Sequence, residues 1–163
     1  MIHSTACVDP QASVAEDAEV GAFTVIGPGV TVESGCRIGP HVVIEGHTRI
    51  GAGTEVSQFA SLGAPPQDKG YAGEPTRTDI GRDCIIREYV TVHRGTPKDR
   101  TLTTVGDGCF LMAYSHVAHD CDLGRNVVMA NAVTLAGHVT IGDYVNIGGM
   151  TAIHQFCRIG RLA

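Results

Sequence analysis

Histidines in the C-terminal third of the chain have the side-chain type and the spacing that acid–base chemistry needs. His119, Gly137 and Gln155 are each separated by 18 residues. His138 directly follows Gly137, and His154 directly precedes Gln155. Imidazole is the side chain whose ordinary pKa lies closest to neutrality. One of these histidines could therefore take a proton from a hydroxyl nucleophile while the others hold the acceptor molecule.

Three further features near His119 fit a general-base site. Asp120 is adjacent in sequence and could orient the imidazole of His119. The N–H of Gly137 could face a developing oxyanion, because a residue without Cβ lets a substrate approach the backbone closely. His116 lies three residues before His119 and belongs near the same place.

A regular pattern of aliphatic residues indicates how these positions come together. An aliphatic residue stands at every sixth position over 2–62, 80–92 and 105–159. A helix repeats near 3.6 residues and a strand at 2, so neither alone explains this period. Such a hexad, often with Gly after the aliphatic residue, is typical of an all-β parallel β-helix of hexapeptide repeats. Three hexads complete one triangular coil of such a helix.

The 18-residue coil places the polar residues in register. Stacked coils are separated by the spacing between strands, about 4.8 Å, so His119, Gly137 and Gln155 should lie above one another at one edge. Four histidines and a glutamine are then expected to converge on a patch about 10 Å tall. The aliphatic positions and a small-residue slot two places earlier should point inward.

Two segments interrupt the period and are predicted to be projecting loops. The first, at about 63–79, is rich in Pro and Gly, and Pro cannot donate to a strand ladder. The second, at about 93–104, follows the hexad position at 92. Loops on a rigid scaffold often carry binding residues. We expect one domain, 1–163, that lacks later coils and a polar cap at its C-terminal end.

Composition narrows the class of protein. The net charge of -5 argues against nucleic acid as the main partner. No basic segment followed by an apolar stretch is visible at the N-terminus, and no apolar run could span a bilayer. These features predict a soluble, cytoplasmic protein without stable membrane insertion. Five of the six cysteines occupy the small-residue slot, which predicts small core residues rather than disulfides or metal ligands.

Some charged and histidine residues carry no functional prediction. His3, His41, His47 and His93 are expected to be scattered surface residues. Arg94 and Lys98 in the second loop are expected to be solvated, or to meet an acidic partner. A zinc site is the alternative use of the clustered histidines, since three of them on adjacent coils could leave one coordination position open to water. Trimeric β-helix carbonic anhydrases are similar in this respect.

Several segments resemble the UDP-N-acetylglucosamine O-acyltransferase family of lipid A biosynthesis, along the chain from the first coil to the last residue. The segments that carry the resemblance are Pro-Gln-Asp at 66–68, Tyr-Ala-Gly-Glu-Pro-Thr-Arg at 71–77, Val-His-Arg-Gly-Thr at 92–96, His-Val-Ala-His-Asp-Cys at 116–121, Thr-Leu-Ala-Gly-His at 134–138 and Gly-Gly-Met-Thr-Ala-Ile-His-Gln-Phe at 148–156.

The resemblance implies a homotrimer of left-handed β-helices with active sites between subunits. It implies transfer of a (3R)-3-hydroxyacyl chain from acyl carrier protein to the 3-hydroxyl of UDP-N-acetylglucosamine, with no metal or other cofactor. His119 matches the catalytic base, with Asp120 beside it and Gly137 at the oxyanion position. The residues that match substrate-contacting positions are Gln67, Asp68, His116, His138, His154 and Gln155.

The chain departs from the family in two places. Gly70 stands where the family has a lysine, and Lys69 precedes it as a possible substitute for that contact. Later coils and a helical domain, which in the family contact the nucleotide and the carrier protein, are not part of this sequence, so we expect weak activity or none from the chain alone. Alternative functions are an N-acyltransferase acting on an amino sugar, a zinc-dependent hydratase, or an inactive solenoid.

Overall fold

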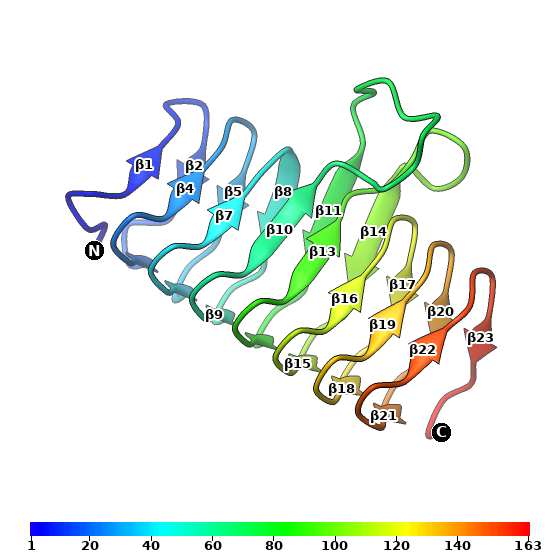
Figure 1. Cartoon of the computed structure of the whole chain (residues 1–163). Helices are drawn as coiled ribbons and strands as arrows, with labels where there is room; N and C mark the ends of the chain where they lie inside the picture. The colour runs from blue at the N-terminus through cyan, green and yellow to red at the C-terminus, as the bar shows by residue number, and fades with distance from the viewer.

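The computed structural model describes residues 1–163 and consists of short parallel strands without any helix. The strands form three sheets, which run as the three faces of a prism from the N-terminal end to the C-terminal end (Figure 1). The predicted fold is confirmed: the chain is a left-handed parallel β-helix of hexapeptide repeats with two projecting loops.

Each coil contributes one strand to each sheet. The first sheet contains β1 (Cys7–Val8), β4 (Val25–Ile26), β7 (Val43–Ile44), β10 (Ser61–Ala64), β13 (Thr91–His93), β16 (His116–Val117), β19 (Thr134–Leu135) and β22 (Ala152–Ile153). The second contains β2 (Ser13–Val14), β5 (Thr31–Val32), β8 (His47–Ile50), β11 (Arg77–Ile80), β14 (Leu102–Val105), β17 (Asp122–Leu123), β20 (Thr140–Ile141) and β23 (Arg158–Ile159). The third contains β3 (Glu19–Val20), β6 (Arg37–Ile38), β9 (Glu55–Val56), β12 (Ile85–Ile86), β15 (Phe110–Leu111), β18 (Val128–Met129) and β21 (Asn146–Ile147).

The aliphatic residue of each hexad points into the prism. Val117 pairs with Leu135 and Leu135 with Ile153, so the inward side chains of successive coils stack directly above one another. Leu111, Val117 and Leu135 are fully buried, and they belong to one continuous core of 32 residues. Burial of this apolar column is the main force that closes each coil.

The prediction that the slot cysteines are small core residues is confirmed for four of the five. None forms a disulfide, and Cys36, Cys84, Cys109 and Cys121 are buried in the small-residue slot. Burial raises the pKa of the Cys121 thiol to about 12, which keeps it protonated. Cys157 has the same place in its hexad but is exposed in the last coil, so for this residue the core prediction was wrong.

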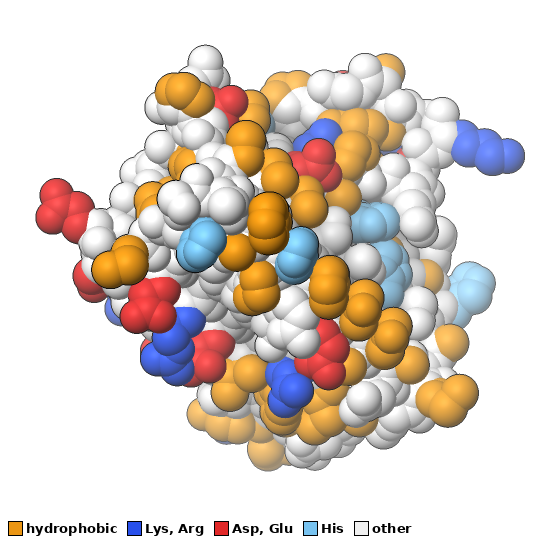
Figure 2. Space-filling view, turned by 60° about the vertical axis from the view of Figure 1, so that its left-hand side comes forward, with side chains coloured by type: hydrophobic (Ala, Val, Ile, Leu, Met, Phe, Trp, Pro, Cys, Tyr) orange, Lys and Arg blue, Asp and Glu red, His pale blue; other side chains and the backbone are white.

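A column of rings follows the corner between the third and first sheets. Phe23, His41, Phe59, Tyr89 and Tyr114 stack in that order at centroid distances of 4.8 to 5.3 Å. All five have positive φ, the conformation that the second residue of most turns adopts here. His41 is exposed, as predicted for an outward position, and it takes part in this column. Figure 2 shows one face of the molecule, on which exposed hydrophobic side chains form rows beside histidines.

Both loops leave the prism at the corner between the first and second sheets (Figure 1). Leu62 pairs with Ile44, three hexads earlier, and also with Val92, which lies more than three hexads later because the first loop intervenes. Ile80 pairs with Val105 across the second loop in the same way. The strands on either side of each loop keep their inward positions, so the extra residues change the corner and leave the core unchanged. No helix of the structure has the length and apolar character needed to cross a membrane.

The core predicts a clear contrast between two neighbouring residues. Leu111→Ala should lower the free energy of unfolding by about 2 to 5 kcal/mol, because it leaves a cavity in a fully buried column. Phe110→Ala, on the outward side of the same strand, should cost much less. Urea unfolding followed by circular dichroism measures both. Equal losses for the two variants would contradict an aliphatic core that carries the stability.

Candidate active site

The turns that carry the predicted site residues occupy the same corner as the two loops. His119 and Asp120 follow β16, Gly137 and His138 follow β19, and Gln155 follows β22. The backbone connects these turns, since the His138 N–H donates to the His119 carbonyl at 3.1 Å. The predicted vertical register is therefore present, and it places the turns of three coils side by side.

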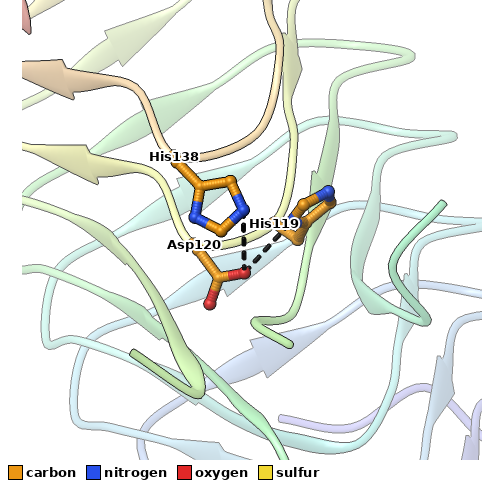
Figure 3. Close-up of side chains that lie close together, drawn as sticks. All are labelled: His119, Asp120 and His138. Carbon is orange, nitrogen blue, oxygen red and sulfur yellow. Dashed lines mark hydrogen bonds and ion pairs between the residues drawn. The ribbon is translucent and has the colours of Figure 1, made fainter. Parts of the chain in front are cut away.

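His119 and Asp120 form the buried part of the site. Both residues are almost excluded from solvent, with His119 8 % and Asp120 2 % exposed. Nδ1 of His119 lies 2.9 Å from Oδ2 of Asp120 (Figure 3). Because an ionised carboxylate can only accept, Nδ1 carries the proton and Nε2 is left as the proton acceptor. Nε2 makes no hydrogen bond within the chain.

The second loop holds Asp120 in place. The Thr96 hydroxyl donates to Oδ2 of Asp120 at 2.6 Å, and the Thr96 N–H donates to both carboxylate oxygens at 3.0 and 3.1 Å. The Asp120 N–H donates to Oγ1 of Thr103 at 2.9 Å. These bonds supply hydrogen-bond partners to a carboxylate whose burial would otherwise be unfavourable, and they fix it beside His119.

His138 faces the same carboxylate from the next coil. Its Nε2 lies 4.0 Å from Oδ2 of Asp120, the same oxygen that bonds His119 (Figure 3). The rings of His119 and His138 meet edge to face, with centroids 5.1 Å apart. Phe156, in the turn of the following coil, stacks on His138 at 4.7 Å. Nδ1 of His138 lies 2.8 Å from Oδ2 of Asp99 in the second loop.

Gly137 gives the His119 ring its space. A Cβ on residue 137 would lie 2.5 Å from Cε1 and 2.8 Å from Nε2 of His119, closer than carbon atoms approach without a shift. The Gly137 N–H donates to no atom of the chain, as at the first turn residue of the neighbouring coils. The position beside Nε2 of His119, rather than the free N–H alone, is what distinguishes Gly137.

His93 and His116 form a second pair of imidazoles, one coil further toward the N-terminus. His116 is half-buried on β16, and its Nδ1 lies 2.7 Å from Oγ1 of Thr91. His93 is 7 % exposed, and its ring meets His116 edge to face at 4.8 Å. The prediction that His93 is a scattered surface residue was wrong. Its position in the hexad is outward, but its ring packs against His116 and is buried.

Burial and mutual repulsion keep these imidazoles neutral. Burial lowers the pKa of His93 from 6.5 to about 4, with smaller contributions from nearby His116 and His119. Nδ1 of His93 is buried without a hydrogen-bond partner. The pKa of His116 is also lowered, first by burial and then by His119. Neutral imidazoles can accept protons as well as donate them, as a proton-transfer site requires.

The remaining predicted site residues lie at the edge of the cluster. Asp68 forms an ion pair with Lys98 of the second loop, whose Nζ lies 2.7 and 2.9 Å from its oxygens. Lys98 holds the pKa of Asp68 below its ordinary value. Gln67 and Lys69 are exposed and make no side-chain hydrogen bond within the chain. His154 and Gln155 are also exposed.

Sequence reasoning assigned no role to Thr96 and Asp99 of the second loop and left the partner of Lys98 open. Thr96 anchors Asp120, Asp99 contacts His138, and Lys98 contacts Asp68. The sequence leaves Lys98 open between solvent and an acidic partner, and the partner proves to lie within the chain. The motif from Val92 to Thr96 is the only sequence signal that points to Thr96.

Three donor groups also lie close enough to hold a metal ion. Ligand atoms of His119, Asp120 and His138 fall within 4.8 Å of one another. The carboxylate of Asp120, however, already accepts from Thr96 and from His119. The donor set is therefore arranged as a hydrogen-bonded base, and metal binding would have to displace the bond that orients His119.

Comparisons with known proteins identify the family to which the chain is similar. A family model described as bacterial transferase hexapeptide (six repeats) matches residues 102–137. The acyl-[acyl-carrier-protein]–UDP-N-acetylglucosamine O-acyltransferase of Herminiimonas arsenicoxydans is 56% identical over 160 residues, which is 98% of this chain and 61% of the relative. The chain belongs to this O-acyltransferase family.

Other members support the same assignment. The family member from Alkalilimnicola ehrlichii is 56% identical over 162 residues, or 99% of this chain and 63% of that protein. The crystal structure of the Acinetobacter baumannii protein LpxA superimposes with a TM-score of 0.96 at 48% identity, covering 98% of this chain and 62% of that one. The chain thus spans about three fifths of the length of the family members that it matches.

Gly137 provides a test of the geometry. Gly137→Ala should displace the His119 imidazole, because the added Cβ would overlap Cε1 and Nε2. We expect changed chemical shifts for the ring of His119 with little loss of stability, since the residue lies at a turn. Gly148→Ala, where an added Cβ meets no atom within 4 Å, is the control. An unmoved His119 ring in the Gly137 variant would contradict the contact.

His93 provides a test of the electrostatics. Its folded pKa of about 4 lies below the ordinary 6.5, so the unfolded chain binds more protons between these values. The contribution of neutral His93 to the free energy of unfolding is therefore complete above pH 6.5, and it should be lost as the pH falls toward 4. His93→Phe, which cannot titrate, should flatten this part of the stability profile measured by urea unfolding. An unchanged profile would show that His93 is not held neutral.

Proposed function

We propose that the chain carries the catalytic site of an acyltransferase that moves a (3R)-3-hydroxyacyl chain from acyl carrier protein to the 3-hydroxyl of UDP-N-acetylglucosamine, the first step of lipid A biosynthesis. One observation supports this most: a buried carboxylate, Asp120, bonds Nδ1 of His119 and leaves Nε2 as an acceptor beside Gly137. The identity to named O-acyltransferases along nearly the whole chain supplies the substrate classes.

The reaction follows from the protonation state of His119. Nε2 takes the proton of the sugar 3-hydroxyl while Asp120 stabilises the imidazolium that forms. The sugar oxygen attacks the thioester carbonyl carbon, and the Gly137 N–H donates to the tetrahedral oxyanion. Collapse of this intermediate breaks the carbon–sulfur bond, and the leaving thiolate of the carrier protein takes the proton from Nε2 of His119.

The remaining histidines and the first loop form the acceptor site in this proposal. His116, His138, His154 and Gln155 hold the sugar nucleotide from the prism corner. The mechanism requires no covalent enzyme intermediate and no cofactor. All of the atoms transferred come from the two substrates.

The proposal includes a homotrimer with clefts between subunits. Gln67, Asp68 and Lys69 of one subunit would then reach the nucleotide sugar bound by the next. The exposure of Gln67 and Lys69 in the single chain is consistent with such a role. The cytoplasmic location stays a prediction of the sequence.

The decisive variant is His119→Ala. It should reduce acyl transfer about 100-fold or more, since a general base typically contributes that much. The assay uses a chimera in which this chain is followed by the C-terminal segment of the Herminiimonas arsenicoxydans relative, with acyl carrier protein thioester and UDP-N-acetylglucosamine. His3→Ala, on a distant exposed histidine, is the control.

Three outcomes would overturn the proposal. More than about a tenth of the transfer remaining in His119→Ala would exclude it as the base. Faster transfer to the 3-amino analogue of the sugar would indicate an N-acyltransferase. Zinc bound at one ion per chain after purification, together with hydration of carbon dioxide, would favour the hydratase alternative.

A further inference from the structure

The second loop carries two adjacent charged residues that contact different parts of the site. Lys98 pairs with Asp68 of the first loop, with Nζ 2.7 Å from Oδ2. Asp99 turns the other way, and its Oδ2 lies 2.8 Å from Nδ1 of His138. Residues 94–101 therefore connect the first loop to the turn after β19, although His138 is 39 residues further along the chain than Asp99.

The position of Asp99 is set by its neighbours on both sides. Arg100 pairs with Asp122 at 3.0 Å, outside the site. Thr96 is bonded to Asp120, and the Thr101 N–H donates to the Thr96 carbonyl at 3.1 Å. With both ends of this short segment anchored, the carboxylate of Asp99 is placed before any substrate arrives, so little ordering is needed when His138 binds a ligand.

The contact with Asp99 decides which nitrogen of His138 carries the proton. An ionised carboxylate accepts and does not donate, so the hydrogen lies on Nδ1 of His138. In the neutral ring Nε2 is then an acceptor, and it faces Asp120 across 4.0 Å, a gap too long for a direct hydrogen bond. Two acceptors around one gap leave room for a donor such as a hydroxyl group.

We infer that Asp99 is a positioning residue of the acceptor site: it holds the Nδ1–H form of His138, so that Nε2 accepts a hydrogen bond from a sugar hydroxyl. Phe156 stacked on the ring restricts the ring's rotation, and Asp99 selects the tautomer. The catalytic consequence rests on the proposed function. The tautomer itself does not depend on it.

Nitrogen NMR of the 163-residue chain labelled at histidine tests the tautomer directly. At pH 7.5 the wild-type His138 should be neutral and protonated at Nδ1. Asp99→Asn should populate the Nε2–H form, because an amide can donate to Nδ1 as well as accept from it. Asp99→Glu should restore the Nδ1–H form. Asp122→Asn, which removes the ion pair with Arg100 of the same loop, should leave His138 unchanged.

Activity of the chimera tests the consequence. Asp99→Asn should lower kcat/KM for the sugar nucleotide about tenfold or more, while KM for the acyl carrier protein thioester stays within about twofold. Asp122→Asn should stay within about twofold in both. Recovery in Asp99→Glu would distinguish a hydrogen bond to His138 from loss of loop structure.

The outcomes separate the two proposals. A wild-type His138 that is protonated at Nε2, or at both nitrogens at pH 7.5, would overturn the inference whatever the activity. An unchanged tautomer in Asp99→Asn would do the same. If the tautomer changes as expected but no acyl transfer is found in the wild-type chimera, the positioning role of Asp99 stands and the proposed function fails.

Discussion

The closure of each coil after three hexads, around a buried aliphatic column, is the constraint on which the rest of the structure depends. The three inward aliphatic residues of each coil, one on each face, pack with the small buried residues on those of the next coil and fix its height and rotation. A residue at any corner therefore has its neighbours determined by sequence position alone. In this protein the corner between the first and second sheets holds polar residues in successive coils, and so becomes a site.

Histidines stacked on adjacent coils would repel one another if they were charged, and their surroundings prevent this. Imidazoles on adjacent coils stand about 5 Å apart, at which distance two positive charges would repel strongly in a buried place. Burial holds His93 and His116 neutral, as the lowered pKa of each indicates. The one buried charge, Asp120, is bonded by Thr96 and His119. The site thus places the ring of His119 beside a fixed carboxylate, which is the arrangement needed to stabilise an imidazolium as it forms.

The sequence predicted the β-helix and the positions of both loops, but not the contacts that the loop residues make. A periodic core is readable because each inward position must be aliphatic, so the neighbours His119, Gly137 and His138 could be placed by counting. Loop residues obey no such rule, because their backbone path is set by tertiary contacts. The contact of Asp99 was therefore not predicted, the acidic partner of Lys98 was left unidentified, and His93 was assigned to the surface because its hexad position is outward. The sequence analysis named only Lys69 as a possible substitute for the lysine expected at position 70. In the structure Nζ of Lys98 lies 2.7 Å from where a Cβ on Gly70 would be, so Lys98 is a second candidate.

The exit of both loops at one corner has a consequence for how such proteins can diversify. An inserted residue in a strand would turn every later inward side chain to the outside until the next compensating change. An insertion at this corner leaves the downstream pairing intact, as the pairs Leu62–Val92 and Ile80–Val105 show. Mutation can therefore lengthen or shorten the loops outside anchoring residues such as Thr96 and Asp99, while the turns that carry His119 and His138 keep their places in the prism.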